Sequence, residues 1–442
     1  MQNASSHFAK DALNPAINAA SNLASNGLPN AGLSPPENAI AANVALILQG
    51  GGARAAYQAG VLKGVSEILG HPTKNPFPII VGTSAGAINA GVLATHADNF
   101  AQAVFALEAL WREIEPSDIY RTDFLGVARC SVRWLTALVF GSLQANRRVS
   151  LFDNSPTVGL LSRITSATKI SQHFENNHLR AVAVTASGYS SGQNCAFFQA
   201  QSDVEGWIRS QRVGIRVAEL TPEHFMASAA IPFAFPAVKI NREYFGDGSI
   251  RQTAPVSPAL HLGASRVFVI GTARLIKDAP SRTRSQTYPS LAQIAGHAMS
   301  SIFLDSLATD IELLQRINAT VSLVDQDKLA ASQIKLQRVE VFVACPDTPL
   351  EGQAHRHVVN LPATIRFLMR SIGAMRKGGS VLASYLLFDK QYCRALIEMG
   401  YADTIARRAE VSVFFDPNAS PIPAIIPNTK FNPQATQKMI AT

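Results

Sequence analysis

The chain has 442 residues, of which 47% are hydrophobic and 16% charged, so it can bury a large core and is not a wholly disordered protein. Lysines and arginines exceed acidic residues by 8, a balance that favours an anionic partner such as a nucleic acid or an acidic membrane surface. No apolar run reaches the roughly 18 residues of a transmembrane helix. The four cysteines form no CxxC pair, so neither a disulfide framework nor a zinc site is indicated, and a reducing compartment fits them best.

Residues 1–43 differ in composition from the rest of the chain. They are rich in Ala, Asn and Ser, contain scattered prolines and have few bulky side chains. Such a segment cannot bury enough surface to offset the entropy lost on ordering. It also lacks the basic and apolar regions of a secretory signal. We therefore expect a disordered leader and a cytoplasmic protein that is peripheral at the membrane.

Strands and helices alternate from residue 44 onward. The apolar run Val44–Leu48 predicts a buried parallel strand, and a helical pattern over 61–69 follows three glycines. A second strand, Pro78–Val81, leads into a helix from about Ser84, and Asp98 is the expected N-cap of the next helix. This order predicts an α/β fold with a mainly parallel sheet.

The pattern changes after about residue 280. Before it, strands are predicted at 181–185, 195–199, 237–240 and 267–270; after it come a long amphipathic helix over 294–317, one strand at 339–343 and mostly helix over 361–409. We therefore expect a sheet domain over 44–275 and a mainly helical C-terminal extension over 276–442.

The pattern G-x-S-x-G occurs twice. Gly188–Gly192 lies between two predicted strands, where it indicates a hairpin turn. Gly82–Gly86 lies between a strand and a helix, which is the setting of a nucleophile elbow: Gly82 and Gly86 avoid clashes, and Ser84 projects from the end of the sheet. The N–H of Ala85 would then lie near a developing oxyanion. The alternative is a capped turn with Ser84 as N-cap.

A second glycine-rich turn, Gly50-Gly51-Gly52-Ala53-Arg54, also lies at a strand-to-helix junction. Its backbone N–H groups can converge on an anionic atom, as in an oxyanion hole, and Arg54 would add positive charge. A dinucleotide fingerprint is the rival interpretation, but the acidic residue that it expects after the second strand is missing. For Arg54 itself the alternative is a solvated arginine at a helix start.

A serine nucleophile needs a base, and Asp247 is the best candidate. It follows a predicted strand and precedes Gly248 and Ser249, where glycine frees the carboxylate to approach another loop; an ordinary turn aspartate is the alternative. No histidine has an obvious catalytic context. His261 remains the base of a rival Ser-His-Asp triad.

Taken together, Gly50–Arg54, Gly82–Gly86 and Asp247-Gly248 in this order resemble the patatin-like phospholipases, over roughly residues 44–272. The resemblance implies a three-layer α/β/α domain and a Ser84–Asp247 dyad that cleaves acyl esters of phospholipids without metal or cofactor. It also implies an oxyanion hole from Gly50, Gly51, Gly52 and Ala53, helped by Arg54. Two residues depart from the family pattern: Ala55 ends the glycine loop, and Ser249 follows Asp-Gly.

Two segments are candidates for contact with an anionic membrane. They are Trp134–Phe140 followed by Arg147 and Arg148, and Arg366–Lys377, where bulky apolar residues alternate with cations. Core-packing helices with charged edges are the alternative for both. No nucleic-acid motif is present, so the expected partner is a phospholipid or other lipid ester. A catalytically weak lipid-binding or scaffold protein with the same fold is the alternative function.

Overall fold

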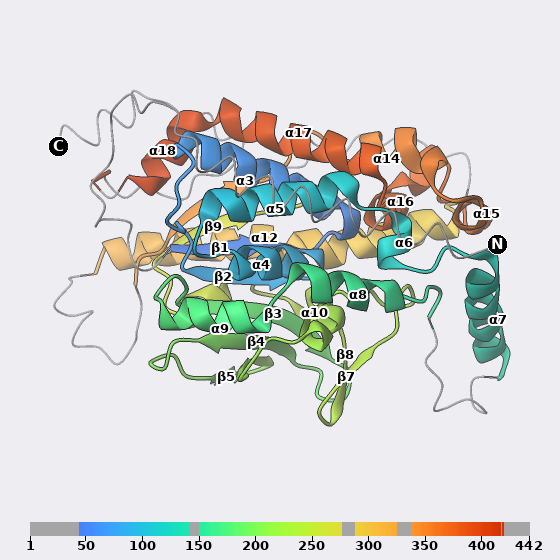
Figure 1. The fold of residues 1–442 in the computed structure, drawn as a ribbon, viewed down its shortest axis with the longest axis horizontal. Coiled ribbons are helices and arrows are strands. Elements are labelled where there is room, and N and C mark those ends of the chain that lie inside the picture. The colour runs from blue at the N-terminus through green and yellow to red at the C-terminus, as the bar shows by residue number, and fades with distance from the viewer. Residues whose placement is uncertain (1–43, 141–149, 276–287, 325–336, 417, 420–442) are drawn as a thin grey trace. The chain divides into compact units, whose positions relative to one another are not determined.

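A computed structural model describes residues 44–140, 150–275, 288–324, 337–416 and 418–419, all of which belong to one compact unit. The predicted leader over 1–43 lies outside these residues. In the described part the centre is one sheet in the order β10-β9-β1-β2-β3-β4-β6-β5, with β8 pairing to β3 and β7 to β8 (Figure 1). The strands are β1 Val44–Leu48, β2 Ile79–Thr83, β3 Ala181–Gly188, β4 Asn194–Ala200, β5 Trp207–Arg209, β6 Arg212–Arg216, β7 Val238–Ile240, β8 Glu243–Asp247, β9 Arg266–Ile270 and β10 Glu340–Ala344.

The sheet is mainly parallel, as predicted. From β10 through β9, β1 and β2 to β3 every neighbouring pair is parallel, whereas the β3–β4, β3–β8, β7–β8 and β5–β6 pairs are antiparallel. Every strand predicted from the sequence is present. The strands β5, β6 and β8 were not predicted, because they are short and their ends carry Arg or Glu instead of an apolar run.

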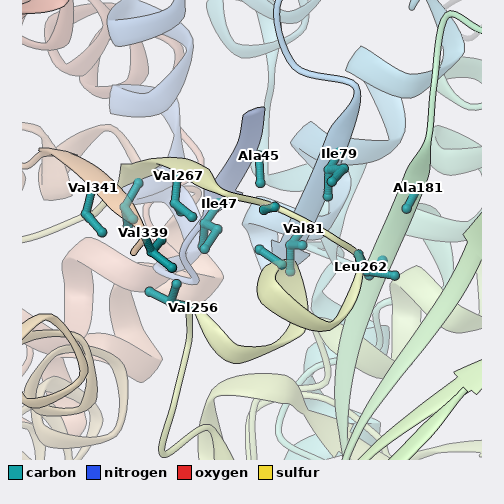
Figure 2. Close-up of a cluster of buried hydrophobic side chains, with 14 of the residues drawn as sticks. Ala45, Ile47, Ile79, Val81, Ala181, Val256, Leu262, Val267, Val339 and Val341 are labelled. Carbon is teal, nitrogen blue, oxygen red and sulfur yellow. The ribbon is translucent and has the colours of Figure 1, made fainter. Parts of the chain in front are cut away.

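Helices cover both faces of the sheet, giving the predicted α/β/α layers (Figure 1). Alternate strand residues such as Ile47, Val81 and Val267, labelled in Figure 2, belong to one buried hydrophobic cluster. The same cluster contains Leu307 and Ile311 of α12. The opposite face carries α3, α4, α5, α17 and α18. The helices are α3 Ala56–Ile68, α4 Ala85–Thr95, α5 Phe100–Glu113, α6 Pro116–Ile119, α7 Phe124–Phe140, α8 Ser155–Ile164, α9 Ala167–Glu175, α10 Pro222–Ser228, α11 Ser257–His261, α12 Leu291–Ser322, α14 Glu351–His357, α15 Ala363–Ser371, α16 Ser380–Leu386, α17 Lys390–Ala406 and α18 Arg408–Phe415.

One predicted helix cap is wrong. Asn99, and not Asp98, is the N-cap of α5, because its side chain accepts a hydrogen bond from the backbone N–H of Gln102 at 3.0 Å. Asp98 instead lies 3.7 Å from the ring of His173. The sequence did not distinguish Asp98 from Asn99, because both residue types are favoured at helix N-caps.

The region after residue 275 shares the sheet. Strand β10 extends it beside β9, and α17 packs along α3. Residue 275, the expected end of the sheet domain, therefore lies inside one compact unit that also contains the region after it. Among the described residues no helix combines the length and the apolar character needed to cross a bilayer.

Candidate active site

Ser84 lies in a sharp turn between β2 and α4. Its backbone has φ 55° and ψ −128°, a conformation that few residues other than glycine adopt. Its neighbours must be small: a Cβ on Gly82 would lie 2.5 Å from Cα of Ala87, and one on Gly86 would lie 2.2 Å from the carbonyl oxygen of Leu48. The Ser84 side chain caps no helix N–H group. The turn has the strand–turn–helix setting and the small neighbours that the sequence prediction of a nucleophile elbow requires, and the alternative of a simple capped turn is not observed.

The hydroxyl of Ser84 donates a hydrogen bond to Oδ2 of Asp247 at 2.5 Å. The two residues come from different elements, since Asp247 is the last residue of β8. Strand β3 holds the two elements in register: Thr185 pairs with Thr83 on one side, and Ala186 pairs with Asp247 on the other. The sheet thereby brings together two side chains that are 163 positions apart in the sequence.

The Asp247 carboxyl is fully buried. Burial raises its pKa from 3.8 to about 6, against the opposing effect of hydrogen bonds from the Ser84 hydroxyl and the backbone N–H of Ser249. Ser84 itself is only 1% exposed. A carboxylate whose basicity is raised by desolvation, and which touches a hydroxyl, is suited to accept that hydroxyl's proton.

The glycine-rich turn after β1 borders this pair. The start of α4 lies directly against the end of β1, next to the turn, because only the absence of a Cβ at Gly86 leaves room for the carbonyl oxygen of Leu48. The turn is fixed by Thr272, whose hydroxyl donates to the carbonyl oxygen of Gly50 at 2.6 Å. Gly52 has φ +55°, and a Cβ there would lie 2.0 Å from the carbonyl oxygen of Tyr385. All predicted residues of this turn, from Gly50 to Arg54, are buried.

Arg54 is fully buried, so a solvated arginine is the wrong interpretation. Its Nε donates to Ser384 at 2.7 Å and its Nη2 to Glu351 at 3.0 Å, while the guanidinium lies over the ring of Tyr385 at 4.2 Å. These partners belong to α14 and α16. The two bonded nitrogens of Arg54 therefore connect the glycine-rich turn to the C-terminal region.

The rival residues have other surroundings. The ring of His261 stacks on Trp207 with 4.8 Å between centroids. Gly188–Gly192 forms the turn between the antiparallel strands β3 and β4, as predicted, with Gly192 at φ +65°. The four cysteines are free.

Several residues that build the site were not found from the sequence. The hydroxyl of Ser228 accepts a hydrogen bond from the backbone N–H of Ser84 at 2.8 Å, and Gln252 donates to Thr83 at 3.0 Å. Ser228 ends α10, within the segment of roughly residues 44–272 that resembles the family, and this resemblance was the only signal for it. Glu351 and Ser384 lie far outside that segment.

Known proteins resemble part of this chain. Residues 46–260 match the family described as patatin-like phospholipase. A cUMP-AMP-activated phospholipase of Escherichia coli is 29% identical over 166 residues, which cover 32% of this chain and 51% of the relative. A cGAMP-activated phospholipase of Pseudomonas aeruginosa (strain BWHPSA011 / Pa011) is 29% identical over 216 residues, 49% of this chain and 55% of the relative.

The chain thus spans about half the length of these curated relatives. The crystal structure of VipD from Legionella pneumophila aligns with 85% of this chain and 72% of its own chain, at 11% identity and with a TM-score of 0.27. The family match covers the elbow, the glycine-rich turn and Asp247 together. Residues 46–260 of this chain belong to the patatin-like phospholipase family.

Proposed function

We propose that the protein is a serine acyl hydrolase that cleaves acyl ester bonds of phospholipids with Ser84 as nucleophile and Asp247 as base. The observation that carries the proposal is the 2.5 Å hydrogen bond between the strained Ser84 and the buried Asp247. The family and the names of the two relatives support a phospholipase in general terms.

In the first half-reaction Oγ of Ser84 attacks the ester carbonyl carbon and its proton passes to Asp247. Backbone N–H groups of Gly51, Gly52, Ala53 and Ala85 are proposed to stabilise the oxyanion that forms on the carbonyl oxygen. When the tetrahedral intermediate collapses, the alcohol leaves with the proton held by Asp247 and the acyl group stays on Ser84. Asp247 then deprotonates a water, which attacks the acyl carbon and releases the fatty acid, and Ser84 regains its proton.

The proposed cycle requires an opening step. Ser84 is 1% exposed and Asp247 is fully buried, so we propose that the structure around them opens before a lipid ester binds. The names of the two relatives state activation by cUMP-AMP and by cGAMP. We therefore propose that this chain, too, is activated before it hydrolyses lipid, and that such nucleotides are the first activators to try.

The experiment is fatty-acid release from mixed phospholipid vesicles by wild type, Ser84→Ala, Asp247→Asn and His261→Ala, with and without each nucleotide. On the proposed mechanism the first two variants lose at least about 10³-fold in rate, and His261→Ala keeps its activity. Loss of activity in His261→Ala at unchanged stability would instead favour a triad. Vesicle binding by a wild type that hydrolyses no ester under any condition would favour a lipid-binding scaffold.

A further inference from the structure

Large apolar side chains are exposed at four places near one end of the sheet. Phe124 (73%) and Leu125 (71%) start α7, Phe367 (77%) lies on α15, Leu291 (70%) starts α12, and Phe233 (80%) lies in the loop after α10. Phe233 also has φ +65°, which is unfavourable for a bulky side chain. Strain of this kind persists where the surrounding structure holds the residue in place.

Hydrogen bonds link the segments that carry these side chains to one another. The N–H of Leu151 donates to the carbonyl of Phe233 at 2.9 Å, and that of Arg121, just before α7, donates to the carbonyl of Asp153 at 2.8 Å. The hydroxyl of Thr364 on α15 donates to the carbonyl of Thr122 at 2.8 Å.

The last link joins α15 to α12, because the N–H of Ala292 donates to the carbonyl of Ile372 at 3.0 Å. In Figure 1, α7 and α15 lie at the same end of the sheet. We call the surface formed by Phe124, Leu125, Phe233, Leu291 and Phe367 the apolar rim.

The rim is close to the candidate active site through two of its elements. The carbonyl of Ala230, three positions before Phe233, accepts a hydrogen bond from the N–H of Asp247 at 2.9 Å. The hydroxyl of Tyr120, which precedes Arg121, donates to the carbonyl of Leu386 at 2.9 Å, directly after the Tyr385 that contacts Gly52. The rim therefore borders both the base and the glycine-rich turn.

The charge of the rim segments is positive. No acidic residue occurs between Asp123 and Asp153, between Glu223 and Glu243, between Asp278 and Asp305, or between Glu351 and Asp389. Among the described residues of these segments, Arg129, Arg366, Arg370 and Arg376 are exposed. Asp123, at the edge of the rim, is neutralised by its ion pair with Arg121. Exposed aromatic and leucine side chains flanked by arginines, with Asp123 held in an ion pair by Arg121, are suited to the interface of an anionic bilayer.

We propose that the apolar rim is the surface by which this protein docks on an anionic phospholipid bilayer, with Phe124, Leu125, Phe233, Leu291 and Phe367 inserted among the head groups and the arginines against lipid phosphates. This inference rests on the proposed function, because docking here brings the dyad to the surface that holds its substrate. Of the two segments predicted from the sequence, Arg366–Lys377 contributes through α15. The Trp134–Phe140 segment ends α7, and Arg147 and Arg148 lie outside the described residues.

The test uses flotation of the full chain with vesicles of phosphatidylcholine alone and of phosphatidylcholine and phosphatidylglycerol in equal parts. The variants are Leu125→Asp, Phe367→Asp and the double variant Arg366→Gln/Arg370→Gln. The matched control is Ile208→Asp, since Ile208 is 75% exposed on β5, away from the rim. Thermal unfolding verifies that each variant is folded.

We expect Leu125→Asp and Phe367→Asp each to weaken binding to the anionic vesicles about tenfold or more, and Ile208→Asp to bind like wild type. The double arginine variant should lose about tenfold or more on anionic vesicles and far less on neutral ones. High salt should reduce the difference between the two vesicle types. In the rim variants, the rate of vesicle hydrolysis relative to the rate with a soluble short-chain ester should fall in parallel with vesicle binding.

Unchanged vesicle binding by folded rim variants would overturn the inference, whatever the enzyme hydrolyses. So would a wild type that ignores vesicles but forms a dimer that Leu125→Asp dissociates, since the rim would then be a contact between copies of the chain. If the variants lose vesicle binding but the wild type cleaves no ester, the docking surface stands and the proposed hydrolase fails.

Discussion

Nη2 of Arg54 donates to Oε1 of Glu351 at 3.0 Å, across 297 positions of sequence. Arg54 ends the glycine-rich turn that is proposed to hold the oxyanion, and Glu351 starts α14, outside the family match. The arginine is fully buried and the glutamate side chain is 25% exposed. Part of the geometry of the proposed catalytic turn therefore depends on the C-terminal region.

Arg54→Lys should destabilise the protein by about 2–4 kcal/mol and lower the rate, because one ammonium cannot replace the separate bonds to Ser384 and Glu351 and leaves a buried charge poorly paired. Urea denaturation measures the free energy of unfolding. The control is Arg121→Lys, at an ion pair whose two side chains are both 48% exposed, where the free energy of unfolding should change little. Equal effects at the two sites would contradict this account of Arg54.

Asp247→Asn should abolish hydrolysis and yet stabilise the fold at neutral pH. Folding raises the pKa of Asp247 from 3.8 to about 6, so the folded state binds more protons than the unfolded state between those values. The contribution of this carboxyl to the free energy of unfolding therefore falls as pH rises through that window, by on the order of 2–3 kcal/mol.

The asparagine does not titrate, so the stability of the variant relative to wild type should rise between pH 4 and pH 7. In urea denaturation at these two pH values, the difference in free energy of unfolding between variant and wild type should shift by about 2 kcal/mol in favour of the variant. Asp203→Asn, which changes a carboxylate 58% exposed, provides the control at an exposed site. A pH-independent difference between Asp247→Asn and wild type would refute the raised pKa.

The rate of wild-type hydrolysis should fall with acid through a pKa near 6, because Asp247 accepts the proton of Ser84 only when it is ionised. The measurement is kcat/KM for a soluble ester between pH 4.5 and pH 8. Activity that stays level down to about pH 4.5 would mean that the Asp247 carboxyl titrates lower than its burial implies, or is not the base.

Gly52→Ala should destabilise the protein far more than Gly70→Ala. Both glycines have positive φ, +55° and +74°, so each substitution costs about 1 kcal/mol in backbone strain. Only at Gly52 would the new Cβ meet a backbone atom, the carbonyl oxygen of Tyr385 at 2.0 Å, whereas nothing lies within 4 Å at Gly70. Thermal unfolding and ester hydrolysis of the two variants separate the effect of backbone strain from that of the steric conflict. Similar losses of stability in Gly52→Ala and Gly70→Ala would show that α16 does not pack tightly against Gly52.

Sequence pattern alone determined the parallel core and the local turns. Apolar runs such as Val44–Leu48 are buried on both faces of the sheet, which makes them recognisable without alternation. The glycines around Ser84 and Asp247 were recognisable because the elbow and the Asp-Gly turn are local structures whose demands on small residues act within a few positions.

Only the tertiary structure decided which distant groups meet. The 2.5 Å contact of Ser84 with Asp247 depends on the register of β3 between β2 and β8, and β8 was not predicted because its ends are charged. The partners of Arg54 and the acceptor Ser228 could not be predicted, since a buried hydrogen bond between distant side chains leaves no periodic signal in sequence. Burial, which sets the pKa of Asp247, is likewise a property of the whole packed chain, because desolvation sums over every element that surrounds the carboxyl.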